Sequence, residues 1–97
     1  MNTLLDAPFD KLPNDPNTKT RIRTVSRFGK FDVCYEEWIW DGIIGESLIF
    51  LHEDIAHWSD ERIKMEMLES TLAYRDHEIT VSRKPPYIFV SFNFKRL

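Results

Sequence analysis

The segment 48–63, LIFLHEDIAHWSDERI, contains histidines and carboxylates near the spacing of a zinc protease motif. That motif needs two histidines four positions apart on one helical face, with a glutamate after the first as general base. His52 and His57 are five positions apart, about 140° around a helix, so a helix directs them to different sides. The segment therefore predicts a junction between a strand and a helix, and we expect no metal site.

Glu37 and Glu46 form a second candidate, because the strand pairing predicted below sets them opposite each other. Two facing carboxylates on an otherwise apolar surface can raise the pKa of one of them or hold a cation. A bulge at residues 36–37, a longer turn or a place at the sheet margin are the alternatives, in which both acids reach water. No other residue supplies a matching acid, base or nucleophile.

Cys34 is the only cysteine, which excludes an intrachain disulfide and predicts a reducing, cytoplasmic setting. No histidine lies near it in sequence, and the predicted pairing sets it between Val25 and Ile49, which indicates a packed, unreactive thiol. The glycines of DGIIGES lack the lysine and helix of a phosphate-binding loop, and no serine occupies a nucleophile elbow. We expect no catalytic residue, no cofactor and no enzymatic activity.

Composition and charge exclude or disfavour several further classes of function. A chain of 97 residues is the size of one domain, and its 13% aromatic content predicts an aromatic core and interface. No apolar run is long enough to cross a bilayer, so we expect no membrane partner. The net charge is -3, and thirteen of the sixteen acids lie in residues 31–78. A nucleic-acid binder is less favoured, although the basic segment 19–30 keeps that alternative open.

The elements that position these residues can be read along the chain. Residues 1–18 predict an irregular N-terminal arm, rich in proline and pinned by Leu4, Leu5, Phe9 and Leu12. Residues 19–97 predict a single α+β domain. Three strands span residues 19–51, a helix follows the N-cap Ser59, and two strands flank the KPP segment at 84–86. The fold class is α+β, an antiparallel sheet of about five strands with one main helix packed on one face.

Two-residue turns at Gly29-Lys30 and Asp41-Gly42 set the strand register by counting. The predicted cross-strand pairs are Phe28–Phe31, Arg27–Asp32, Arg23–Glu36 and Arg21–Trp38 for the first hairpin, and Tyr35–Leu48, Glu37–Glu46, Trp38–Gly45 and Ile39–Ile44 for the second. Counting further sets His52 opposite Phe31.

Side-chain alternation divides the three strands into two faces. The predicted core face carries Ile22, Phe28, Phe31, Val33, Tyr35, Ile39, Ile44, Leu48 and Phe50. The other face carries Arg21, Arg23, Val25, Arg27, Asp32, Cys34, Glu36, Trp38, Trp40, Ile43, Ile49 and Leu51. The helix has two apolar stripes, Ile63 with Met67 and Tyr74, and Met65 with Leu68 and Leu72. One helix can cover only one face, so apolar surface is left over.

Surplus apolar surface of this kind marks an interface. We expect a small non-enzymatic protein–protein interaction module, such as an inhibitor, immunity factor or adaptor, that can also self-associate. The predicted partner-binding residues are Arg21, Arg23, Trp38, Trp40, Ile43, Ile49 and Leu51. One alternative is a nucleic-acid-binding module that uses the basic first strand. The other is a small-molecule binder with a pocket between sheet and helix near Tyr35, Glu37 and Glu46.

Overall fold

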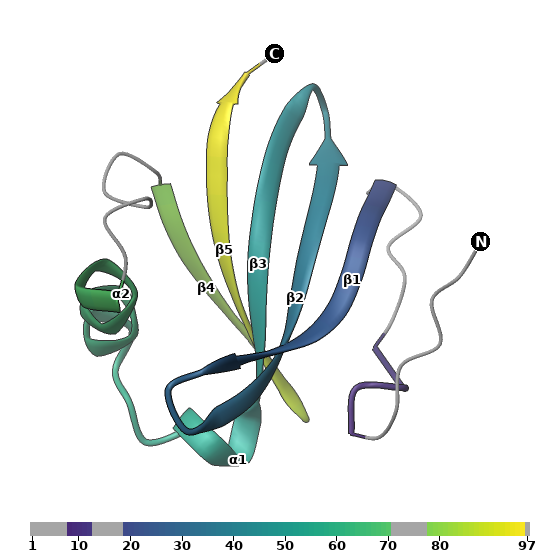
Figure 1. The fold of residues 1–97 in the computed structure, drawn as a ribbon. Coiled ribbons are helices and arrows are strands. Elements are labelled where there is room, and N and C mark those ends of the chain that lie inside the picture. Colours follow the sequence, from purple (N-terminus) through teal and green to yellow (C-terminus); the bar gives the residue numbers. More distant parts are fainter. Residues whose placement is uncertain (1–7, 13–18, 71–77, 97) are drawn as a thin grey trace.

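The computed structural model describes residues 8–12, 19–70 and 78–96, and in it five antiparallel strands form one sheet (Figure 1). The elements are β1 (Lys19–Phe28), β2 (Phe31–Trp40), β3 (Ile43–Leu51), α1 (His52–Ile55), α2 (Asp60–Ser70), β4 (Glu78–Lys84) and β5 (Tyr87–Arg96). The strand order is β1-β2-β3-β5-β4, so the second hairpin adds to β3 through its last strand. The predicted α+β class, with one main helix beside an antiparallel sheet, is confirmed.

Both predicted tight turns are present. Gly29 has φ of 60°, and Asp41 and Gly42 have φ of 48° and 72°, the left-handed geometry that turns of the hairpin type require. The β2–β3 register follows the prediction from Tyr35–Leu48 to Ile39–Ile44, and Glu37 does pair with Glu46.

The pairing predicted between Arg21 and Trp38 is wrong. The β1–β2 register holds from Phe28 to Ile22 and then shifts, so that Thr20 pairs with Trp38. Arg21 is the extra residue of this irregularity, which lets β1 bend near its start. The side chain of Arg21 is not among those that the structure describes.

The junction between β3 and the main helix contains a short helix that counting along the strand missed. β3 ends at Leu51 and α1 begins at His52, so the predicted pairing of His52 with Phe31 is wrong. The backbone N–H of His52 donates instead to the carbonyl of Pro86, 2.8 Å away. Ser59 caps α2 as predicted, because its Oγ accepts from the backbone N–H of Arg62 at 3.1 Å.

The first core cluster lies between the helices and one face of the sheet. Its centre is Val33, Phe50, Ile55, Ile63, Met67, Ile88, Val90 and Phe92, all completely buried. The stripe Ile63–Met67 thus covers the sheet, while Met65 and Leu68 remain 58% and 40% exposed. Leu72 and Tyr74 lie outside the described residues.

Ile22 was expected in this core, but it is 48% exposed. The buried members of the cluster come from the two helices, the link between them and β2 to β5. Among the described side chains of β1, only Phe28 packs against them. The helices therefore do not cover the middle of β1.

The second core cluster lies on the opposite face and joins the N-terminal arm to the sheet. Phe9 and Leu12 pack with Cys34, Ile49 and Tyr87. The Tyr87 hydroxyl also donates to the carbonyl of Pro8 at 2.8 Å. The predicted pinning of the arm is confirmed for Phe9 and Leu12, whereas Leu4 and Leu5 lie outside the described residues.

No helix in the described part of the chain is both long and apolar enough to cross a membrane.

Candidate functional site

A row of polar residues crosses the face of the sheet opposite α2. The register places Arg23 of β1, Glu36 of β2, Ser47 of β3 and Ser91 of β5 in successive partner positions. On one side of this row lie Cys34 and Ile49 of the second core cluster. The two tryptophans of β2 lie on the other side, where Trp38 is partly exposed and Trp40 is 47% exposed.

Arg23 and Glu36 form an enclosed charged contact on this face. Nε and Nη2 of Arg23 both donate to Oε2 of Glu36, at 2.8 and 2.6 Å. Their side chains are only 13% and 10% exposed. Burial of a charge is costly without such a partner, so Glu36 neutralises Arg23 and holds it in place.

The other arginine of β1 with a described side chain is held loosely. Nε of Arg27 lies 3.7 Å from Asp32, and both side chains are about 70% exposed, at 70% and 67%. Contacts of this kind are weak in water and salt. Each arginine nevertheless has an acid beside it, so no specific observation favours phosphate binding by these two residues.

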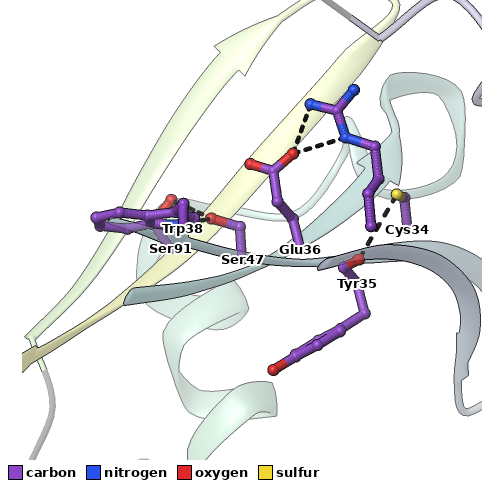
Figure 2. A network of polar contacts seen from close by, with 7 residues as sticks. Cys34, Tyr35, Glu36, Trp38, Ser47 and Ser91 are labelled. Carbon is purple, nitrogen blue, oxygen red and sulfur yellow. Dashed lines mark hydrogen bonds and ion pairs between the residues drawn. The ribbon is translucent and has the colours of Figure 1, made fainter. Parts of the chain in front are cut away.

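Trp38 is fixed flat against the sheet by three neighbouring residues. Its ring lies over Gly45, where any Cβ would collide with the ring carbons. Its Nε1 donates to Ser47 Oγ at 2.8 Å, and Ser47 Oγ lies 2.9 Å from Ser91 Oγ. Figure 2 shows this chain of contacts beside Glu36. Trp38 is therefore pre-ordered while remaining partly exposed.

Trp40 is the exposed member of the pair. It follows Trp38 by two residues on β2 and so faces the same side of the sheet, and it is 47% exposed. Ile43 pairs with it across the Asp41-Gly42 turn and is partly buried. We call Trp38, Trp40 and Ile43 the tryptophan surface.

Six of the seven predicted partner-binding residues fall into two environments, and the side chain of the seventh, Arg21, lies outside the described residues. Trp38, Trp40 and Ile43 form the tryptophan surface, and Arg23 adjoins it through the polar row. Ile49 is completely buried in the second core cluster, and Leu51 packs against that cluster. Phe9 and Leu12 cover this part of the face, because the N-terminal arm returns to the sheet.

Sequence reasoning did not single out Ser47 and Ser91, which orient Trp38. For Ser47 a signal is present in the predicted β2–β3 register. Ser47 pairs with Glu36 and is diagonal to Trp38, within reach of a long side chain. The pairing of β3 with β5, which brings Ser91 to Ser47, could not be counted across the helix.

Glu37 and Glu46 lie on the same face as Tyr35, opposite the tryptophan surface (Figure 2 shows Tyr35 leaving the sheet away from Glu36). The pKa of Tyr35 is raised to about 12. Burial is the main cause, followed by the negative charges of Glu46 and Glu37 and a hydrogen bond to Glu46. This arrangement keeps the phenol protonated, and it provides no nucleophile at neutral pH.

Cys34 is also kept in its neutral form. Burial raises its thiol pKa to about 11, with Arg23 opposing and Glu36 reinforcing the shift. Its side chain is fully buried under the N-terminal arm. A thiol of this kind is a packing group at neutral pH.

A hollow of about 450 Å³ lies between the β1–β2 turn and α2, away from Tyr35, Glu37 and Glu46. Aromatic rings of Phe28, Phe31 and Trp58 line it, as do Lys30 and Arg62. Arg62 lies 4.5 Å over the Trp58 ring. In the described residues no three histidine, cysteine or acidic side chains gather as a metal site would require.

Comparison of this chain with protein-family models, with curated proteins and with solved structures finds no match. The geometry of the chain itself is therefore the basis for a functional proposal.

Proposed function

We propose that the protein is a non-enzymatic interaction module that binds another protein through the tryptophan surface. The observation that carries this proposal is that Trp38, held by a hydrogen bond to Ser47, and Trp40, which is 47% exposed, lie on the same face of β2. Tryptophan is among the residues most enriched at binding hot spots, and a pre-ordered ring loses little conformational entropy on binding. Arg23 of the polar row lies beside this surface, and its charge is compensated by Glu36.

The same surface supports self-association as a second consequence of the proposal. A domain of this size exposes much of its apolar surface, and a twofold contact could cover Trp40 with its own copy. We also propose a reducing, cytoplasmic compartment, since the single cysteine of the chain can form no intrachain disulfide. Sedimentation at increasing protein concentration tests self-association directly, with wild type compared with Trp40→Ala.

Capture from the native host tests the main proposal. Tagged wild type, Trp40→Ala and Met65→Ala are used as baits, and captured proteins are quantified by mass spectrometry. Met65 is the matched control, because it is a large apolar residue that is 58% exposed on α2. The proposal expects proteins that Trp40→Ala loses and Met65→Ala retains. Equal capture by all three baits would overturn it.

A further inference from the structure

The hollow between the β1–β2 turn and α2 is separate from the tryptophan surface. It has a volume of about 450 Å³, which is within the range of small-molecule sites, about 300–1,000 Å³. Its lining comes from the β1–β2 hairpin, from both helices and from the link between them. It therefore lies on the face of the sheet that α2 covers, whereas the tryptophan surface lies on the other face.

Aromatic side chains form the apolar wall of the hollow. The ring of Phe31 meets that of Trp58 edge to face, with centroids 5.8 Å apart. Phe28 and Phe31 also pack edge to face against Phe50, which is completely buried. Because these contacts hold the rings in place, a further aromatic ring can pack against them with little loss of conformational entropy in the wall.

The charged side chains of the lining are balanced in sign. Lys30 and Arg62 are basic, and Asp54 and Glu66 are acidic. Nε of Arg62 lies 3.9 Å from Oε1 of Glu66, so these two charges already attract each other. A ligand with a single charge would be attracted by two of the four groups and repelled by the other two. The lining therefore favours a ligand that carries one positive and one negative charge.

Lys30 and Asp54 form no ion pair with any residue that the structure describes. The Lys30 ammonium lies 5.5 Å from the centroid of the Phe31 ring, so a carboxylate that binds it lies beside the apolar wall. The flexible stem of a lysine lets its ammonium follow such a group. Asp54 of α1 is partly exposed and supplies the opposite charge.

We propose that this hollow binds a free aromatic amino acid. The ring of the ligand packs against Phe28, Phe31 and Trp58. Its carboxylate binds the Lys30 ammonium, and its α-ammonium group binds the Asp54 carboxylate. This ligand site is a second property of the chain and does not depend on the proposed function.

A series of small molecules tests the site in the full-length protein, with binding followed by amide chemical shifts in two-dimensional NMR. L-Phenylalanine carries the ring and both charges. Phenylpropionate lacks the ammonium group, phenethylamine lacks the carboxylate and L-leucine lacks the ring. We expect a Kd of about 1 mM or tighter for L-phenylalanine, and binding about fivefold weaker for each of the other three. The amides that shift should be those of Gly29, Lys30, Phe31, Asp54, His57 and Arg62.

Three results of this series would overturn the proposal. They are no binding of L-phenylalanine, shifts confined to other parts of the chain, and binding of phenylpropionate, phenethylamine or L-leucine as tight as that of L-phenylalanine.

Two substitutions each remove one charge from the hollow, and each has a matched control. Lys30→Gln is compared with Lys84→Gln, because Lys84 also lies over an aromatic ring, 5.9 Å from the centroid of Phe89, but does not line the hollow. Asp54→Asn is compared with Glu53→Gln, which changes the neighbouring acid outside the lining. We expect the Kd for L-phenylalanine to rise about fivefold in Lys30→Gln and Asp54→Asn and to stay unchanged in both controls. An unchanged Kd in either of the first two variants, once circular dichroism shows it to be folded, contradicts the assigned contacts.

The ligand series also tests which charge each residue binds. Lys30→Gln should not alter the binding of phenethylamine, which has no carboxylate. Asp54→Asn should not alter the binding of phenylpropionate, which has no ammonium group. Weaker binding in either combination would refute the assignment of the two charges. Trp40→Ala should bind L-phenylalanine as wild type does, so that failure of the tryptophan surface and failure of the ligand site are distinguishable.

Discussion

Trp38 and Gly45 are cross-strand partners, and the tryptophan ring occupies the space that a side chain at residue 45 would need. Glycine is therefore required at this position by close packing. The contact allows Trp38 to lie flat and to donate to Ser47, which links the geometry of β3 to the shape of the tryptophan surface.

Gly45→Ala should displace the Trp38 ring. We expect a loss of about 1–3 kcal/mol in the free energy of unfolding, the usual range for overpacking. Urea denaturation of wild type, Gly45→Ala, Trp38→Ala and the double variant measures it. If the added Cβ collides with the Trp38 ring, Gly45→Ala should lower the free energy of unfolding by less in the Trp38→Ala background than in wild type. Equal costs in both backgrounds would show that the ring does not press on residue 45.

Glu36→Gln should remove the carboxylate that Nε and Nη2 of Arg23 both contact. We expect a loss of about 3 kcal/mol in the free energy of unfolding, because a mostly buried charge loses the carboxylate with which it forms an ion pair. Asp32→Asn is the matched control, since its contact with Arg27 is exposed, and it should change stability by about 0.5 kcal/mol or less. Similar effects of the two substitutions would contradict the enclosed pair.

Cys34 should resist alkylation in the folded protein. Its pKa of about 11 leaves little thiolate at neutral pH, and Phe9 and Leu12 cover it. Iodoacetamide labelling, followed by mass spectrometry, should be slow in buffer and fast in denaturant. Phe9→Ala should speed it by opening the second core cluster. Rapid labelling of folded wild type would refute the burial of this thiol.

Tyr35 should make stability fall at high pH. Its pKa rises from 10.0 to about 12 in the folded protein, so the folded state holds the proton more tightly than the unfolded chain. The corresponding stability is fully present below pH 10 and is lost as the pH rises toward 12. Denaturation across this window should give a shallower decline for Tyr35→Phe than for wild type. Parallel declines would exclude a contribution from Tyr35.

The arrangement of β1, β2 and β3 could be predicted from the sequence because the residues of their two tight turns are recognisable. Asp41-Gly42 and the glycine at 29 determine two hairpins, and counting from them places Glu37 opposite Glu46 and Trp38 opposite Gly45. No turn residue marks the irregularity at Arg21, so counting along β1 continues through this position without a shift. The short helix at His52 and the β3–β5 pairing depend on contacts distant in sequence, such as the hydrogen bond from His52 to Pro86.

Part of the candidate site could also be predicted from a local sequence pattern. Strand alternation alone places Trp38 and Trp40 on one face. It does not reveal that Phe9 covers Ile49 on that face, because residues 8–12 reach the sheet through tertiary packing rather than through a local pattern.

Calorimetric titration of the purified partner tests the central claim most directly. The partner is the host protein that Trp40→Ala fails to capture, and the titrated proteins are wild type, Trp40→Ala and Met65→Ala, each first shown to be folded by circular dichroism. Loss of a hot-spot tryptophan costs about 2 kcal/mol or more, about a thirtyfold weaker Kd. We predict that loss for Trp40→Ala and an unchanged Kd for Met65→Ala. The same Kd for wild type and Trp40→Ala would contradict binding through the tryptophan surface.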